Sequence, residues 1–150
     1  MAMDPQRRAA LIASAVEAQA YPPEAAVAKA WLEENIDQYW DIDAQVRVGP
    51  GVDLGPDYSP NIQKMAAQAT RKRVDLVAYD MDGAIIVELK DHVDLAAVRQ
   101  AIEYGRLWNI APIDPPLKAI LVAGRTGDAD IMATAARQGV TVELFPQVTV

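Results

Sequence analysis

The chain has 150 residues, of which 51% are hydrophobic, and it carries a formal net charge of −7. This length predicts a single domain with a real hydrophobic core. No apolar run approaches the roughly 20 residues of a membrane span, and no signal-peptide layout opens the chain, so we expect a cytoplasmic protein with no membrane contact. The absence of cysteine and the single histidine, His92, exclude thiolate and multi-histidine metal sites. Any metal must therefore be bound by oxygen, which favours Mg²⁺, Mn²⁺ or Ca²⁺.

The negative charge is concentrated in the first part of the chain. Residues 1–60 contain ten acids and four bases, whereas residues 61–150 contain eleven acids and ten bases. An acidic chain is atypical of proteins that coat nucleic acid. The basic run Arg71-Lys72-Arg73 could nevertheless bring local positive charge to the strand that follows it, although such a run is also typical of a solvated helix end.

Local patterns predict an alternation of helices and strands along the chain. Apolar residues that recur every three to four positions indicate helices, and apolar residues that alternate with polar ones indicate strands. In chain order we expect helices over residues 5–20 and 24–37, a strand over 42–48, a loop over 49–60, a helix over 61–69, a hairpin over 74–90, a helix over 95–109 capped by Asp94, a proline-rich connection over 111–116, a strand over 117–123, a loop over 124–127, a helix over 128–138 and a strand over 140–145.

This order of elements predicts an α/β fold. The first three strands are expected to pair antiparallel, and the later strand–helix–strand units are expected to add parallel strands through crossovers. The result is a mixed central β-sheet flanked by helices on both faces, a three-layer sandwich.

The predicted hairpin over residues 74–90 is the most informative segment. One placement of its turn sets Asp75 opposite Glu88, and the alternative sets Asp75 opposite Lys90. Side chains alternate between the two faces of a strand with a period of two, and the two placements differ by two residues. In either placement Asp75, Glu88 and Lys90 therefore share one face of the hairpin. Their apolar neighbours point the other way, into a core: Leu76, Val87 and Leu89.

Two carboxylates on one face of a hairpin repel each other. A divalent cation with oxygen ligands would offset this repulsion, and Lys90 adds a positive charge that could bind phosphate or hold a water. Two carboxylates, a metal and a lysine suffice for phosphodiester cleavage. The alternative is a solvated strand face with a cross-strand ion pair, worth less than about 1 kcal/mol.

An acid on the second strand and Glu-x-Lys on the third, in this order of elements, resembles the PD-(D/E)xK nuclease superfamily. The next helix carries Gln100 and Tyr104 on one face, which looks like the RecB-like branch. The alternative for this pair is a core aromatic beside a surface glutamine. The resemblance implies a restriction-endonuclease-like three-layer sandwich.

Residues 22–145 resemble more closely the catalytic domain of NucS-type endonucleases, with Glu24 on the early helix. We therefore expect one nuclease-like domain with an N-terminal helix over residues 1–21, a catalytic core over 22–145 and an insertion over 49–71. The insertion either contributes to substrate recognition or is a surface flap. The separate N-terminal DNA-binding domain of those enzymes has no counterpart in this sequence, so mismatch cutting is not implied.

The resemblance also implies roles for individual residues. Asp75 and Glu88, with the main-chain carbonyl of Leu89, would bind Mg²⁺ or Mn²⁺. Lys90 would orient or deprotonate the attacking water, or stabilise the transition state. The supporting residues would be Glu24 as an accessory acid, with Glu33 and Glu34 as competitors, and Gln100 and Tyr104 to position Lys90 or the substrate backbone.

Three functions remain open at this point. The leading expectation is a metal-dependent nuclease that acts on DNA rather than RNA, as a homodimer or with a partner protein that supplies substrate selection. The second is a non-catalytic binding or assembly module on a nuclease-like fold, which the acidic charge favours. The third is an unrelated α/β domain in which the three residues coincide by chance.

Overall fold

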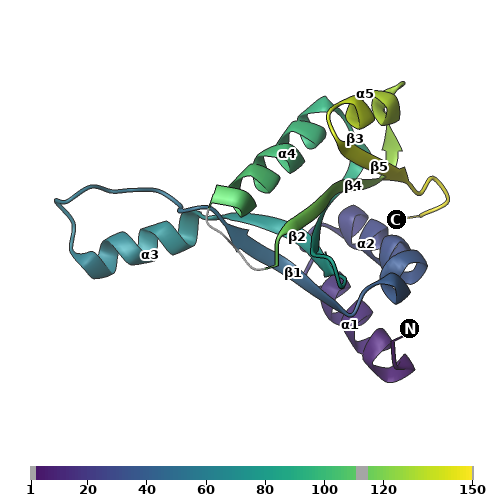
Figure 1. Ribbon diagram of the computed structural model, residues 1–150, viewed down its shortest axis with the longest axis horizontal. Helices are drawn as coiled ribbons and strands as arrows, with labels where there is room; N and C mark the ends of the chain where they lie inside the picture. Colours follow the sequence, from purple (N-terminus) through teal and green to yellow (C-terminus); the bar gives the residue numbers. More distant parts are fainter. Residues whose placement is uncertain (1–2, 111–114, 150) are drawn as a thin grey trace.

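The structure, a computed structural model, describes residues 3–110 and 115–149. One five-stranded sheet is flanked by helices, as predicted (Figure 1). None of the described helices is long and apolar enough to cross a membrane. The elements in chain order are α1 (Pro5–Glu17), α2 (Pro22–Asn35), the 3₁₀ turn η1 (Ile36–Gln38), β1 (Asp41–Val48), α3 (Pro60–Thr70), β2 (Lys72–Tyr79), β3 (Ala84–Val93), α4 (Leu95–Ile110), β4 (Leu117–Gly127), α5 (Ile131–Arg137) and β5 (Val140–Leu144).

The strands lie in the order β1-β2-β3-β4-β5. The first three pair antiparallel, and β3, β4 and β5 pair parallel. The predicted mixed sheet is therefore confirmed, with α4 and α5 as the two crossover helices. Residues 111–114 of the expected proline-rich connection lie outside the described residues.

The end of β4 corrects one prediction. Residues 124–127 were expected to form a loop because they include two glycines, but they continue the strand. Gly124 pairs with Lys90 and Gly127 pairs with Val93, so the parallel ladder with β3 runs through both glycines. A side chain at Gly124 would overlap that of Val93, so the glycine serves close packing here rather than a turn.

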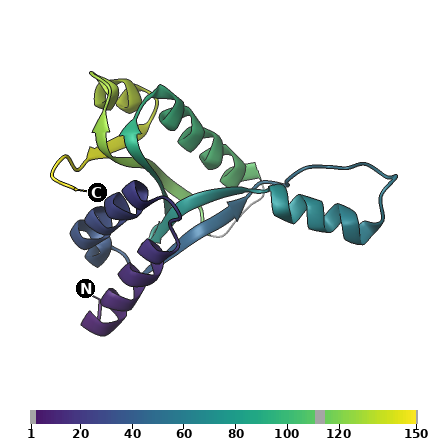
Figure 2. The same cartoon turned by 180° about the vertical axis from the view of Figure 1, so that it is seen from behind.

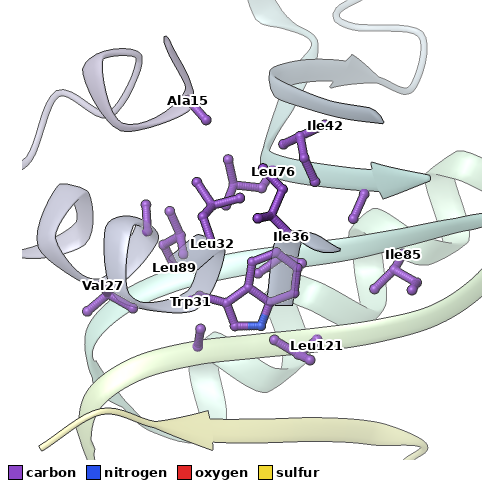
Figure 3. Close-up of a cluster of buried hydrophobic side chains, with 14 of the residues drawn as sticks. Ala15, Val27, Trp31, Leu32, Ile36, Ile42, Leu76, Ile85, Leu89 and Leu121 are labelled. Atoms are coloured by element: carbon purple, nitrogen blue, oxygen red, sulfur yellow. The ribbon is translucent and has the colours of Figure 1, made fainter. Parts of the chain in front are cut away.

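Helices cover both faces of the sheet (Figures 1 and 2). The core between the sheet and the α1–α2 side centres on Trp31, which is fully buried (Figure 3). On the opposite face, α4 and α5 pack on two further clusters that include Trp108 and Val122. Between these layers, the sheet is closed to water along most of β3.

Helix boundaries follow local chemistry. The side chains of Asp4 and Asp94 cap α1 and α4, and Asp94 Oδ1 accepts a hydrogen bond from the Ala97 N–H at 2.9 Å, as predicted. The helix predicted over 128–138 begins three residues later, since Asp130 has a left-handed φ of 63°. Gly139, with φ 77°, closes α5 as expected.

Residues 49–71 form an arm that projects from the sheet (Figures 1 and 2). Its loop, 49–59, runs out, and α3 returns to the start of β2. The Arg71 guanidinium closes its base by donating to the carbonyls of Gly49 and Arg47, at 2.7 and 3.1 Å. Gly51, at φ 74°, lets the loop approach the α3 backbone where a side chain would overlap the Ala67 carbonyl.

Candidate active site

The hairpin brings Asp75 and Glu88 together. Tyr79 pairs with Ala84, and the ladder continues to the pair Leu76–Val87, so Asp75 lies opposite Glu88. This is the first of the two registers that the sequence allowed. Beyond that pair, carboxyl groups replace the backbone partners: Glu88 Oε1 accepts from the Asp75 N–H at 3.2 Å, and Asp75 Oδ2 accepts from the Leu89 N–H at 2.9 Å.

A break in side-chain alternation surrounds Asp75. On β1, Ala44 faces the α1–α2 core, whereas Val46 faces the core under α4, although both have the same parity. Gln45 lies between them with a left-handed φ of 54°, directly opposite Asp75. The irregular backbone lets the Asp75 carboxyl reach sideways to the β3 backbone, which a regular strand would not allow.

Burial dominates the electrostatics of the carboxyl pair. Glu88 is 2% exposed. Desolvation, and then the charge of Asp75, raises the pKa of Glu88 to about 9. Desolvation also raises the pKa of Asp75, although hydrogen bonds from the Leu89 N–H and neighbouring side chains oppose the shift. Within the described part of the chain, neither carboxyl has a cationic partner within 4.0 Å, so no ion pair favours the ionised form of either group.

Lys90 lies beside this pair. It is half-buried, and its charge lowers the pKa of Glu24, Asp75 and Glu88 alike. Over residues 3–110 and 115–149 it forms no ion pair within 4.0 Å. The structure therefore groups the three hairpin residues as predicted, and it keeps the lysine close to the acids without locking it to one of them.

Glu24 joins the group from the first turn of α2. Burial raises its pKa first, the Asp75 charge raises it further, and Lys90 lowers it. Glu33 and Glu34 lie near the far end of the same helix, about 14 Å along its axis. Both are exposed, and Glu33 lies 3.9 Å from Lys29. Of the three candidate accessory acids, the structure places Glu24 at the site.

The donor set suits a small hard cation only in part. Among the described residues, no three Asp, Glu, His or Cys side chains converge closely enough to hold a metal by themselves. The buried carboxyl of Glu88 and the half-buried carboxyl of Asp75 supply oxygen ligands that no ion pair occupies among the described residues, and the Leu89 carbonyl is the third candidate. Mg²⁺ is commonly held by one or two carboxylates and keeps several waters, so the residues present fit that ion.

Gln100 and Tyr104 approach from α4. The Gln100 amide donates to the Tyr104 hydroxyl at 2.6 Å, so the two residues share one face of α4, as predicted, and also contact each other. Tyr104 is 7% exposed. Burial raises its pKa, and the charges of Glu88 and Asp75 add to the increase. Tyr104 is thus both a core aromatic and a neighbour of the carboxyl pair. The two interpretations of this residue drawn from the sequence, a core aromatic and a site residue, therefore both apply.

Two glutamines at the site were not predicted. Gln19, which is 8% exposed, donates to the carbonyls of Ala15 and Asp75, both at 3.2 Å. Its own oxygen accepts from the Gln45 amide at 2.8 Å. Hydrogen bonding from Gln45 also lowers the pKa of Asp75. Neither glutamine has a signal in the sequence, because Gln19 falls in the helix predicted over residues 5–20 and Gln45 in an alternating strand. The helix prediction was too long at this end, since α1 ends at Glu17 and Gln19 lies beyond it.

The adjoining ends of β3 and β4 are held by polar pairs. Asp91 binds Arg125 at 2.7 Å, and this guanidinium holds the pKa of Asp91 below its usual range. His92 contacts Asp128 at 2.6 Å and Thr126 at 2.9 Å. These contacts keep the strand ends together immediately beyond Lys90, where a rigid site needs support.

A concave surface also exists at the other end of the hairpin. A cavity of about 530 Å³ is lined by side chains that include Trp40, Asp80 and Met81. Met81 belongs to the hairpin turn, so this cavity is separate from the carboxyl pair. The acids with raised pKa values lie at the carboxyl pair rather than in this cavity, and strongly perturbed pKa values cluster at functional sites.

Comparisons of the chain with protein-family models, curated proteins and solved structures found no match. The function must therefore be argued from the chemistry of the site.

Proposed function

We propose that the chain is a metal-dependent deoxyribonuclease on a restriction-endonuclease-like fold of the PD-(D/E)xK type, related to its RecB-like and NucS-type branches. The observation that supports this most is the pair formed by buried Glu88 and half-buried Asp75 beside Lys90. Burying two acids without an ion-pair partner destabilises a protein, and a bound divalent cation would remove that cost.

The chain's residues would divide the work as follows. Asp75 and Glu88, with the Leu89 carbonyl, would hold Mg²⁺ or Mn²⁺. The metal would lower the pKa of bound water and stabilise charge on the attacked phosphate. Lys90 would orient or deprotonate the attacking water, or stabilise the negative charge of the transition state.

The supporting residues would act through position. Glu24 would hold a water near the carboxyl pair from the first turn of α2. Tyr104, oriented by its hydrogen bond from Gln100, would limit the space open to the substrate backbone or to Lys90. Gln19 and Gln45 would fix the irregular backbone at Asp75, because Gln19 donates to the Asp75 carbonyl and Gln45 donates to the Gln19 side chain.

The test is cleavage of labelled DNA substrates (single-stranded, duplex, flap and mismatched) with Mn²⁺ or EDTA. Lys90→Ala is expected to abolish cleavage and retain Mn²⁺ binding, whereas Asp75→Ala is expected to lose both. Lys29→Ala, an exposed lysine of α2, is the matched control and should cleave like the wild type. Calorimetric titration of Mn²⁺ measures binding, and equal affinities for the Lys90 and Asp75 variants would contradict the assignment.

A non-catalytic binding or assembly module is the second candidate, because the net charge is −7. Mn²⁺ binding without turnover on DNA or RNA substrates would favour it. Failure to bind Mn²⁺ would instead indicate that the carboxyl pair is structural.

A further inference from the structure

Positive charge is segregated at the arm. Residues 59–74 contain four bases, Lys64, Arg71, Lys72 and Arg73, and no acid, although the whole chain has a net charge of −7. The acids of the arm, Asp53 and Asp57, both belong to its loop rather than to α3. The helix and the start of β2 therefore form a local cationic surface on an acidic protein.

Two arginines at the base of the arm face each other. Arg47 of β1 pairs directly with Arg73 of β2, and both are exposed. Within the described residues, neither these arginines nor Lys72 forms an ion pair within 4.0 Å. Like charges directly opposite in an antiparallel pair destabilise the sheet. A bound polyanion would offset this repulsion.

Helix α3 lacks the packing that normally stabilises a helix. In the part of the chain that the structure describes, it packs extensively against no other helix or strand (Figure 2). The side chains of Ile62 and Met65 are 49% and 71% exposed. A helix shorter than about 12 residues is marginal by itself in water. Its polar side chains include three amides, Asn61, Gln63 and Gln68, and one base, Lys64, which are groups that contact nucleic-acid backbones and base edges.

The cationic surface is close to the carboxyl pair. Arg73 lies two residues before Asp75 on β2, which is about 7 Å along an extended strand. A polyanion bound at Arg47 and Arg73 would therefore extend naturally to the proposed cleavage site. Cationic binding and metal-dependent cleavage would then act on one substrate.

We propose that the arm, together with Arg47, Lys72 and Arg73, binds duplex DNA next to the cleavage site, with α3 along a groove and the basic residues on phosphates. This inference rests on the proposed nuclease function and specifies its substrate as double-stranded. An α-helix fits the major groove, which is about 12 Å wide. Residues 49–71 contain one aromatic residue, Tyr58, which is too few for base stacking along a single strand.

The experiment measures binding without cleavage. A labelled duplex is titrated with the full chain in EDTA, by fluorescence anisotropy at several salt concentrations. The variant Arg47→Ala/Arg73→Ala removes the facing pair, and Lys29→Ala/Arg137→Ala removes two exposed bases elsewhere. The slope of log affinity against log salt is expected to fall by about 1.8 in the first variant, since each lost phosphate contact removes about 0.9. At 0.1 M salt this corresponds to roughly 60-fold weaker binding, and the control should bind like the wild type.

The possible results separate the two proposals. Salt-dependent duplex binding that weakens in the arginine variant supports the inference, even if no substrate is ever cleaved. Cleavage by the wild type with duplex binding unchanged in the arginine variant overturns the inference and leaves the nuclease proposal intact. Tighter binding to single strands than to duplex also overturns it. So does self-association that Met65→Glu abolishes without any duplex binding, because α3 would then bind a second copy. Thermal unfolding checks that each variant is folded.

Discussion

Replacement of Glu88 by glutamine should stabilise the metal-free protein. The carboxyl group is 2% exposed, and its pKa in the folded chain is raised from 4.5 to about 9. Glutamine has the same shape, its oxygen can still accept from the Asp75 N–H, and its amide can donate to the Asp75 carboxylate. The substitution therefore removes the free-energy cost of protonating this acid on folding at neutral pH, and it creates no cavity.

The direction and magnitude of this stability change follow from proton linkage between folding and the titration of Glu88. Because the folded-state pKa of Glu88 is raised, its contribution to stability is fully present below about pH 4.5 and is lost as the pH rises towards 9. At pH 7 the loss amounts to about 2.5 pH units, or about 3 kcal/mol at 1.36 kcal/mol per unit. Glu88→Gln should be more stable than the wild type by a similar amount, and the difference should shrink in acid.

The assay is chemical denaturation in EDTA at several pH values. Glu33→Gln, an exposed acid on α2, serves as the control and should change the free energy of unfolding by less than about 0.5 kcal/mol. Two results would refute the reasoning. One is a Glu88→Gln variant no more stable than the wild type at pH 7. The other is a wild-type pH dependence between 5 and 9 that the variant retains unchanged.

Two further predictions concern the metal and the arm. Mn²⁺ binding at pH 7 should release about one proton, because a carboxyl must be ionised to bind the metal and Glu88 retains its proton without metal. Calorimetric titration in two buffers of different ionisation enthalpy measures the number of protons released. Equal binding heats in the two buffers would contradict the prediction. Gly51→Val should loosen the arm, because a side chain at this left-handed position overlaps the Ala67 carbonyl. Proteolysis within residues 49–71 should then be faster, while the melting temperature stays nearly unchanged. An unchanged rate of proteolysis would show that Gly51 does not hold the loop against α3.

Much of the candidate site could be predicted from local rules. The grouping of Asp75, Glu88 and Lys90 depends on the period of two along a strand and on a short turn, both of which are readable from residue order. The choice between the two registers was not readable, since the turn signal spans several polar residues. The backbone pairing of Tyr79 with Ala84 decided it.

Other features depended on contacts between distant segments. The glycines of residues 124–127 indicated a loop, but β3 supplies a partner along that entire stretch. Gln45 adopts a left-handed backbone that its sequence does not favour. Its hydrogen bond to Gln19 and its place opposite Asp75 involve residues 26 and about 30 positions away, so no local pattern could reveal them.

The sequence by itself determined the α/β class, the two helical layers and the shared face of the three hairpin residues, because these follow from short-range periodicity. Only the tertiary structure decided that Glu88 is buried with no ion pair among the described residues, that Glu24 rather than Glu33 or Glu34 lies near Asp75 and Lys90, and that α3 projects into solvent. Burial and ion pairing arise from segments that meet in space, and the pKa of a carboxyl depends on those neighbours rather than on its place along the chain.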